Sequence, residues 1–589
     1  MKPVLILGAG INGAAVARDL AINGIPVCMV DTGDVARGAT SRSSRLIHGG
    51  LRYLEYRDTE LVRESLKERE LLLKLAPHFV KPLRLSIPVN RRFGGLWAGF
   101  VRFSGLAQSA AGQALLRFGR GPRGLLAVRV GLWMYDWLAR SDTLPPHDVQ
   151  RLGSSSNNDA LPSVGTTSVP DVPRDRFQWL CSYSDAQIEF PERFVLAMLE
   201  DGRRAAEKSG AMFDVLPHHR TVVSESSPAM SIVPVKNEDP DTHASEPRTI
   251  EPSIIINATG AWGDRTLEAL GLKENQLFAG TKGSHLFTTH QPLIDALHNS
   301  GIYAEANDGR LIFILPCAGG ILIGTTDDPY PGDPGDAIST PAEVNYLLEM
   351  VNNIFPRVCL TAEHVAMHHA GVRPLPRCDS SSASAIPRGH SIEVTSLHGV
   401  PILTLVGGKL TTCRSLAEQV CSLVCHNLAR HRTHSTSDKL IAGAEDFPQP
   451  AQLEQHHRSL ATQYALSMEQ VETVWNLIGN RFDEVFDRRD ADTPALQDTV
   501  HHHESIVGTT LPKALVRWSI EREWCTKLED LVERRLMLVF HAEISRDTLN
   551  ELGKALVDAG WLEESRLDAE VNSAIDRLQK FYGKTVTTD

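Results

Sequence analysis

The opening residues of the chain contain glycines at a spacing that suits phosphate binding. Gly8, Gly10 and Gly13 belong to a G-x-G-x-x-G loop. Gly8 permits a tight turn, Gly10 lets backbone N–H groups approach a pyrophosphate, and Gly13 lets a helix pack closely against a strand. Asp31 is placed to accept hydrogen bonds from an adenosine ribose. These residues predict that the chain binds a dinucleotide.

A β-α-β unit is needed to bring these residues together. Residues 4–7 predict a buried strand, residues 14–20 supply the apolar side of a helix, and residues 27–30 predict a second strand that ends at Asp31. The N-terminus of the helix adds partial positive charge where the phosphates would lie. Strand, loop, helix, strand and acid follow in the required order. This order favours a Rossmann-like unit over an ordinary glycine-rich turn.

A second loop indicates which dinucleotide is bound. Residues 38–55 follow directly and are rich in hydroxyl groups, glycines and arginines. A flavin needs such a loop, because its pyrophosphate and ring lie along small residues that let the backbone approach. Residues 254–260 predict a strand ending in Asn-Ala-Thr-Gly, which again places small residues beside the cofactor. The predicted cofactor is FAD, and its predicted binding residues are Gly8, Gly10, Ile11, Asn12, Gly13, Asp31, Thr40, Ser41, Ser44, Leu46, His48, Gly49, Ala258, Gly260, Gly371, Gly408 and Lys409.

Six motifs together resemble those of one enzyme family. They are the glycine loop and residues 46–54, 282–285, 324–327, 371–374 and 407–410. In this order they resemble the FAD-dependent glycerol-3-phosphate dehydrogenases of the D-amino-acid-oxidase-like flavoprotein superfamily. The resemblance covers most of the chain. It implies an α/β fold, in which a Rossmann-like FAD-binding domain carries an antiparallel β-rich substrate cap and a C-terminal helical domain.

The resemblance also implies an activity. It is the oxidation of sn-glycerol 3-phosphate to dihydroxyacetone phosphate by hydride transfer to flavin N5, with the electrons passed to a membrane quinone. A phosphate dianion needs fixed cations, and arginine offers a bidentate fork. The predicted substrate-binding residues are Arg52, Tyr53, Thr325, Arg373 and Arg388.

Removal of the substrate hydroxyl proton requires a base. Histidine is suited to this task near neutral pH. His285 is the preferred candidate, and His48 in the flavin loop is the second. Lys409 could stabilise the developing alkoxide or the negative charge of the reduced flavin. A structural hydrogen-bonding role for either histidine is an equal alternative.

The composition sets limits on the class of protein. The chain has 589 residues, 42% of them hydrophobic and 22% charged, which predicts a globular protein of two or three domains. A net charge of −12 gives no reason to expect nucleic-acid binding. Nine cysteines without a C-x-x-C motif favour a reducing compartment. We expect no signal peptide, no membrane-spanning segment and no metal site, the histidines at 501–503 being interpreted as a solvated loop.

One segment departs from the acidic balance. Residues 71–135 contain ten lysines and arginines but no aspartate or glutamate, and aromatic and aliphatic residues lie between the cations. Such a segment suits a surface that sinks partway into an anionic bilayer. Residues 84–135 are therefore predicted to dock the chain on the cytoplasmic face of the inner cell membrane, with part of the protein in the cytoplasm. A solvated basic face over a helical core is the alternative.

The domains are predicted from these motifs and from periodicity. Residues 1–90, 177–270 and 366–430 are assigned to a discontinuous FAD-binding domain, and residues 91–176 to the basic insert. Residues 271–365 form the predicted cap, with a hairpin joining 311–316 to 321–326. Residues 456–589 form the predicted helical domain, with helices expected over 460–486, 512–525, 528–540, 546–559 and 567–581. A homodimer is possible.

Three other functions remain open. A glycerol-3-phosphate oxidase would use the same site but pass electrons to oxygen. Another flavoprotein of this class would act on an amine or a hydroxy acid, although phosphate-directed arginines argue against it. A membrane-docked scaffold would keep FAD for stability alone.

Overall fold

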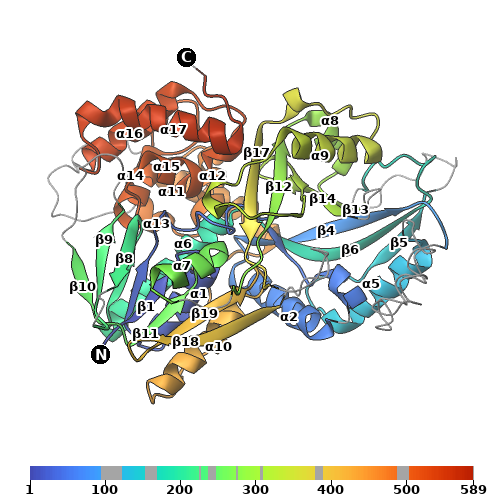
Figure 1. Cartoon of the computed structure of the whole chain (residues 1–589). Helices are drawn as coiled ribbons and strands as arrows, with labels where there is room; N and C mark the ends of the chain where they lie inside the picture. Colours follow the sequence, from blue (N-terminus) through green and yellow to red (C-terminus); the bar gives the residue numbers. More distant parts are fainter. Residues whose placement is uncertain are drawn as a thin grey trace.

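Two large β-sheets organise the computed structural model of the chain (Figure 1). One sheet has six strands and the other has ten. The described residues are 1–56, 58–93, 123–152, 169–223, 227–235, 247–272, 276–305, 310–377, 389–486 and 503–587.

The six-stranded sheet is the centre of the nucleotide-binding part. Its strand order is β18-β19-β11-β1-β2-β7, and β18 alone is antiparallel to its neighbour. The strands are β1 (Val4–Leu7), β2 (Val27–Val30), β7 (Phe213–Leu216), β11 (Ile254–Asn257), β18 (His390–Leu397) and β19 (Val400–Gly407). The predicted β-α-β unit is confirmed as β1, α1 (Ile11–Ile22) and β2.

Both faces of this sheet are covered, which explains why β1 consists of apolar residues only. Val4 and Ile6 pack with helices α1, α6 (Pro191–Ser209) and α10 (Cys413–Asn427). Leu5 and Leu7 face the opposite way, toward α7 (Gly263–Ala269) and a three-stranded sheet. Successive side chains of a strand point to opposite faces, so a strand between two layers has no polar side. The small sheet consists of β8 (His219–Val223), β9 (Met230–Pro234) and β10 (Arg248–Ile250).

The ten-stranded sheet combines segments that are far apart in the chain. Its path is β16-β12-β15-β14-β13-β4-β6-β3, with β17 added beside β12 and β5 beside β6. It includes the predicted cap and also strands from within residues 1–90 and 177–270, so the division into residue ranges stays a prediction. The predicted hairpin is observed as β14 and β15. The strands are β3 (Leu46–Ile47), β4 (Val80–Val89), β5 (Asp148–Arg151), β6 (Trp179–Ile188), β12 (Thr281–Thr288), β13 (Gly301–Glu305), β14 (Leu311–Cys317), β15 (Gly320–Gly324), β16 (Asp328–Pro329) and β17 (Met367–Arg373).

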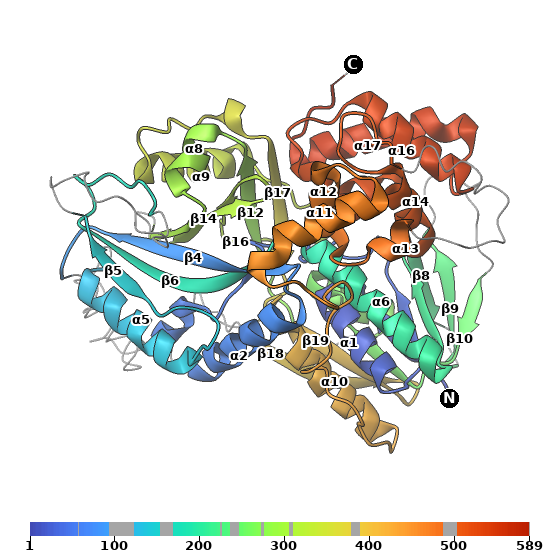
Figure 2. The ribbon, with the colours of Figure 1, turned by 180° about the vertical axis from the view of Figure 1, so that it is seen from behind.

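Helices cover this second sheet in two places. α8 (Gln291–Leu297) and α9 (Pro341–Ile354) share a hydrophobic cluster with β12, β13, β14 and β15. α2 (Thr59–Leu75) and α5 (Leu125–Ala139) pack against β4 and β6. Figure 2 shows α2 and α5 side by side beneath these strands. Of the predicted bilayer-docking segment, residues 94–122 lie outside the described residues. In the ranges that the structure describes, no helix is long and apolar enough to cross a bilayer.

The predicted C-terminal helical domain is confirmed. Its hydrophobic cluster reaches the ten-stranded sheet at Phe287, Leu322 and Met367. The single helix expected over residues 460–486 is wrong, because Ala465 and Gly479 adopt left-handed backbone angles, with φ of 52° and 63°. Each ends a helix in this way. The helices are α11 (Leu453–Tyr464), α12 (Met468–Ile478), α13 (Phe482–Phe486), α14 (Lys513–Arg522), α15 (Leu528–Asp530), α16 (Arg546–Asp558) and α17 (Leu567–Tyr582).

Buried ion pairs join this domain to the nucleotide-binding part. Asp34, in the loop after β2, accepts hydrogen bonds from the guanidinium groups of Arg534 and Arg535. Asp530 and His218 lie next to Asp34, and a carboxylate oxygen of Asp530 is 3.1 Å from Nε2 of His218. The two arginines neutralise the carboxylates of this group, so it serves as an ionic contact between domains.

Candidate active site

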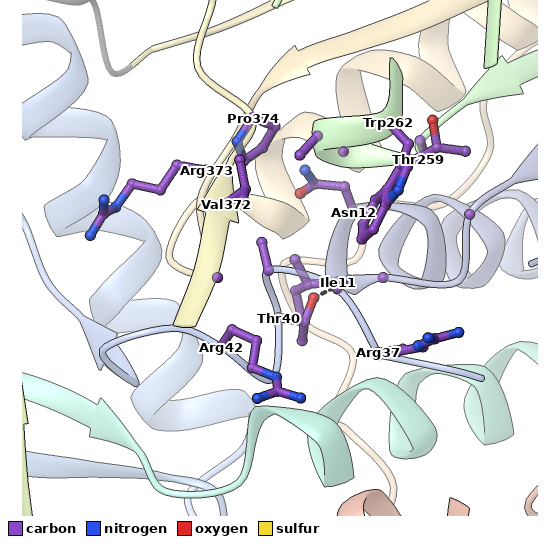
Figure 3. A pocket seen from close by; sticks show the side chains of 18 of the residues that line it. Ile11, Asn12, Arg37, Thr40, Arg42, Thr259, Trp262, Val372, Arg373 and Pro374 are labelled. Carbon is purple, nitrogen blue, oxygen red and sulfur yellow. Dashed lines mark hydrogen bonds between the residues drawn. The ribbon is translucent and has the colours of Figure 1, made fainter. Parts of the chain in front are cut away.

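A cavity of about 880 Å³ lies where the two sheets meet. Figure 3 shows lining side chains from the start of α1, from the loop after β2 and from the end of β17. Most of the predicted site residues line this cavity, although they come from five separate parts of the chain. The predicted residues that line it are Gly8, Gly10, Ile11, Asn12, Asp31, Thr40, Ser44, Leu46, His48, Tyr53, Ala258, Gly260, His285, Gly371, Arg373, Gly408 and Lys409.

The glycines of the first loop are required by close backbone contacts. A Cβ atom on Gly8 would lie 2.6 Å from the carbonyl oxygen of Ala258, and the φ of Gly8 is +102°. A Cβ atom on Gly13 would lie 2.0 Å from the carbonyl oxygen of Gly8. Gly13 does not line the cavity, and its position agrees with the predicted role in helix–strand packing. The loop can therefore hold this shape only with glycine at both positions.

Asp31 organises the loops around the cavity. Its two carboxylate oxygens accept hydrogen bonds from the N–H groups of Ala9 and Gly33, at 2.7 and 2.8 Å. Burial raises the pKa of this carboxyl above its usual value. Each carboxylate oxygen has a further lone pair, so the predicted contact with a ribose hydroxyl remains available.

The N-terminus of α1 also holds its neighbours in place. The N–H group of Ile11 donates to the hydroxyl of Thr40 at 3.0 Å. The side-chain oxygen of Asn12 is buried and has no hydrogen-bond partner among the described residues. A Cβ atom on Gly408 would lie 2.5 Å from the Asn12 amide nitrogen. Backbone and small residues thus form a cradle at a helix N-terminus, and an unpaired buried oxygen offers a hydrogen-bond acceptor to a ligand. This arrangement fits FAD.

His285 lies in the cavity wall in a dry environment. Its Nε2 atom is 2.9 Å from the hydroxyl oxygen of Ser44, and its ring stacks on His369 with centroids 5.0 Å apart. Nδ1 of His285 has no hydrogen-bond partner within the part of the chain that is described. Burial, together with the positive charge of Arg373, lowers its pKa to about 3. The imidazole is therefore neutral near pH 7 and can accept a proton from a bound ligand.

His48 and Lys409 lie together on another part of the wall. The N–H group of His48 donates to the hydroxyl of Thr411 at 3.1 Å. Burial lowers the pKa of the His48 imidazole to about 4, so this ring is neutral as well. The ammonium group of Lys409 lies 4.0 Å from the ring centroid of Tyr53, which is a cation–π contact. These side chains place a fixed cation beside a neutral base.

Arg373 is a cation of the cavity that neighbouring side chains hold in one orientation. Its guanidinium donates to Asp327 at 2.9 Å and to the Thr325 hydroxyl at 2.9 Å. Its side chain is 25% exposed, so an anion in the cavity can reach it. Thr325 does not line the cavity and instead orients Arg373. A guanidinium that is held in one orientation and partly exposed to the cavity suits recognition of a phosphate or a carboxylate.

Besides Gly13 and Thr325, four predicted residues lie outside the cavity wall or are not described. Ser41 donates its hydroxyl hydrogen to backbone carbonyls of its own loop, and Gly49 donates to a buried tyrosine. Arg52 lies in the short helix η1 (Leu51–Tyr56) beside Tyr53 and does not line the cavity. Arg388 lies outside the described residues.

Several residues that line the cavity were not predicted from the sequence. Arg42 lies in the flavin loop, residues 38–55, and Arg37 directly precedes it. The many arginines of that loop could have indicated that these two line the cavity. Trp262 follows the strand that was predicted to approach the cofactor. Arg577 and Phe581 come from α17 of the C-terminal domain. Nothing in their local sequence indicates that α17 reaches the cavity.

Comparison with known proteins identifies the family. The family model described as FAD dependent oxidoreductase matches residues 3–414. The chain belongs to the FAD-dependent oxidoreductases. The model of the C-terminal domain of alpha-glycerophosphate oxidase matches residues 434–566. The predicted family, fold class and cofactor of this FAD-dependent oxidoreductase are thereby confirmed.

Relatives of known name cover nearly the whole oxidoreductase. A glycerol-3-phosphate dehydrogenase of Synechocystis is 30% identical over 95% of this chain and 93% of its own. A D-erythritol 1-phosphate dehydrogenase of Brucella abortus is also 30% identical, over 91% of this chain and 94% of its own. An aerobic glycerol-3-phosphate dehydrogenase of Escherichia coli is 32% identical over 71% of this chain and 72% of its own.

A solved structure shows the same fold. The glycerol-3-phosphate dehydrogenase of Bacillus halodurans, solved with FAD, has a TM-score of 0.64 and 20% identity, and covers 99% of this chain and 95% of that one. The cradle, the oriented arginine and the neutral histidines of this FAD-dependent oxidoreductase can together bind an anionic substrate, orient it and accept a proton from it.

Proposed function

We propose that this oxidoreductase converts sn-glycerol 3-phosphate to dihydroxyacetone phosphate and passes the electrons to a membrane quinone. The observation that carries the substrate assignment is that Arg373, Lys409 and the neutral His285 line one cavity with the FAD cradle. The names of the relatives support a phosphorylated polyol.

Each side chain has a separate role in the proposed reaction. FAD, when bound, takes the hydride from C2 of the substrate. Arg373, aligned by Asp327 and Thr325, supplies the positive charge that attracts the phosphate. Lys409 lies beside Tyr53 and stabilises negative charge that develops on the C2 oxygen. These cations fix the phosphate and the C2 oxygen, which orients C2 for the transfer.

His285 accepts the hydroxyl proton in this proposal. Its pKa, lowered to about 3, keeps the ring unprotonated near neutral pH and makes it a weak base, so its contribution depends on its position at the substrate hydroxyl. Ser44 holds one ring nitrogen, which fixes the plane of the imidazole. His48 is the second candidate for the same step, and it has the same neutral state.

An anaerobic titration tests the substrate assignment. The purified yellow protein is mixed with sn-glycerol 3-phosphate, and the loss of the flavin absorption near 450 nm is recorded. We expect rapid and complete bleaching, and little with glycerol, an amino acid or a hydroxy acid. Absence of bleaching would refute the proposal, and would favour a scaffold if no substrate bleaches the flavin.

D-Erythritol 1-phosphate is the second candidate substrate, because a dehydrogenase of that name is as similar as the first relative. The same titration separates the two. We expect sn-glycerol 3-phosphate to give the higher ratio of reduction rate to half-saturating concentration. The opposite ranking would assign the longer polyol phosphate.

The proposed acceptor and location rest on the outer face of α5. Trp133 and Trp137 are 63% and 56% exposed, and the cations Arg92, Arg129 and Arg140 are exposed nearby. Exposed indole rings beside arginines suit the interface of an anionic bilayer. A quinone must be met at such a bilayer, and we propose the cytoplasmic face of the inner cell membrane. The possible homodimer stays a prediction.

Co-sedimentation with vesicles tests the docking. The double variant Trp133→Ser/Trp137→Ser should lose most of its binding to vesicles that contain phosphatidylglycerol. Trp561→Ser is the matched control, because Trp561 is 47% exposed in the C-terminal domain. Equal binding of both variants would refute the docking surface. Hydrogen peroxide released in air, compared with quinone reduced, separates a dehydrogenase from an oxidase.

A further inference from the structure

Helix α5 has an inner face that reaches the flavin loop. Tyr135 lies on this face, with only 1% of its surface exposed. Its hydroxyl donates to the carboxylate of Asp185, whose two oxygens are 2.7 and 2.9 Å away. The same hydroxyl oxygen accepts a hydrogen bond of 2.9 Å from the N–H group of Gly49. A side chain of α5 thereby holds the backbone of the flavin loop directly.

Glycine at position 49 makes this contact possible. A Cβ atom there would lie 2.6 Å from the Tyr135 hydroxyl and 2.5 Å from a methyl group of Leu66. Gly49 does not line the cavity, so room for a cofactor does not explain this glycine. Its small size instead lets Tyr135 reach the main chain at the residue that follows His48.

The hydrogen bonds in this cluster have a fixed direction. Asp185, on β6, is buried and pairs with Arg69 of α2 at 2.8 Å. Arg69 also pairs with Glu70 at 2.9 Å. Burial and the nearby Asp185 raise the pKa of Tyr135 well above its usual value, so the hydroxyl keeps its proton and donates it to Asp185. The hydroxyl oxygen remains the acceptor for Gly49.

The backbone of His48 and Gly49 is therefore held at both residues. Thr411 binds the backbone of His48, with its oxygen 3.1 Å from the His48 nitrogen. The hydroxyl of Tyr135, on α5, accepts a hydrogen bond from the next N–H group, that of Gly49. The ring of His48 then lies between Tyr53 and Phe313, at centroid distances of 6.4 and 6.3 Å. A shift of this peptide would move the ring within the cavity wall.

We propose that Tyr135 and Asp185 are positioning residues for the flavin loop, which fix the Gly49 backbone and with it the place of the His48 ring beside the flavin. The proposal rests on the proposed function in assuming that His48, the second candidate for the base, contacts the bound substrate or the flavin. A role in packing alone would require only the ring of Tyr135, which contacts the Tyr183 ring edge-on at 5.7 Å. A phenylalanine would supply that contact without burying a hydroxyl group.

The decisive variant is Tyr135→Phe in the full-length protein loaded with FAD. It keeps the ring and removes the two hydrogen bonds, whereas a change of Asp185 would also remove the buried carboxylate that pairs with Arg69. We expect the maximal rate of flavin reduction by sn-glycerol 3-phosphate to fall about fivefold, the effect of about one hydrogen bond. The half-saturating concentration should change less than twofold. Tyr183→Phe is the control, and should change neither quantity more than twofold.

A double-mutant cycle shows whether Tyr135 acts through His48. In a His48→Asn background, Tyr135→Phe should have no further effect on the reduction rate, because the group that it positions is gone. An equal loss in both backgrounds would overturn the proposal. So would a Tyr135→Phe enzyme that reduces its flavin at the wild-type rate, even if it were less stable to heat.

A measurement without substrate separates this proposal from the proposed function. The visible absorption bands of the bound flavin report the environment of its ring, and they should shift in Tyr135→Phe but not in Tyr183→Phe. If the wild-type protein is not bleached by the substrate but the bands shift as expected, the proposed function fails and the positioning role stands. Unchanged bands and an unchanged rate together would refute the positioning role.

Discussion

The two sides of the cavity are built in different ways. The cofactor side consists mainly of backbone and small residues within residues 8–49, where a Cβ atom on Gly8 or Gly13 would meet a main-chain oxygen at 2.6 or 2.0 Å. The substrate side consists of charged and polar side chains from β12, β17 and the end of β19, held by hydrogen bonds. Added side-chain volume should therefore impair the cofactor side, and loss of charge should impair the substrate side.

The largest effect is expected from added volume on the cofactor side. Gly13→Val should yield a colourless protein without FAD, because the new Cβ atom would lie 2.0 Å from the Gly8 carbonyl oxygen, which cannot move without opening the loop. The ratio of absorbance at 450 nm to that at 280 nm measures the bound flavin. A yellow Gly13→Val protein would show that the cofactor side tolerates added volume.

A glycine outside the cradle provides the control for this change. Gly131 lies in α5, where an added Cβ atom would meet only a methyl group of Leu51 at 3.9 Å. Gly131→Ala should keep its full complement of FAD, since alanine is also the better helix former. Loss of flavin in this variant would mean that the assay reports general instability.

Removal of charge on the substrate side should affect catalysis and spare the cofactor. Arg373→Leu should lower kcat/KM about a hundredfold, the effect of losing charge-assisted hydrogen bonds to a phosphate. FAD content should stay unchanged. Arg373→Lys should recover part of the loss, because it restores the charge but not the fork. A leucine variant with normal kcat/KM would show that the phosphate binds elsewhere.

A smaller loss is expected from the proposed base. His285→Ala should lower the turnover at least tenfold and retain FAD, since proton transfer by a positioned base contributes at least this much. Stopped-flow reduction of the flavin measures the step directly. Near-normal turnover would remove His285 from the mechanism and leave His48 as the candidate.

The smallest effect concerns stability in acid. The pKa of the His285 ring is about 3 in the folded protein and 6.5 in the absence of burial. Between these values the unfolded chain binds a proton that the folded chain does not, so the free energy of unfolding falls as the pH falls. His285→Gln should weaken this dependence by up to about 2 kcal/mol between pH 7 and pH 5. Thermal unfolding at both pH values tests it, and identical slopes for variant and wild type would contradict a buried neutral ring.

The cofactor side was largely predictable from the sequence. The strand at 4–7, the glycine loop and the strand at 27–30 are confirmed, because one short segment contains both the elements and the glycines that they require. The hairpin of β14 and β15 was predicted for the same reason. The substrate side was predicted as a set of residues from family resemblance, but their contacts were not. Ser44 beside His285 and Asp327 beside Arg373 join segments far apart in the chain.

The sequence by itself determined that a dinucleotide binds at the start of the chain, since the loop that binds it consists of contiguous backbone. Only the tertiary structure decided which side chains meet at the reacting end. β12 pairs with β15 and β17 in a register that sets His285 opposite Gly324 and His369, and Thr281 opposite Arg373. Register depends on packing between strands that are distant in the chain, and a shift by one residue would turn every side chain to the other face. For the same reason, the reach of Tyr135 and Phe581 toward the flavin loop and cavity could be seen only in the folded chain.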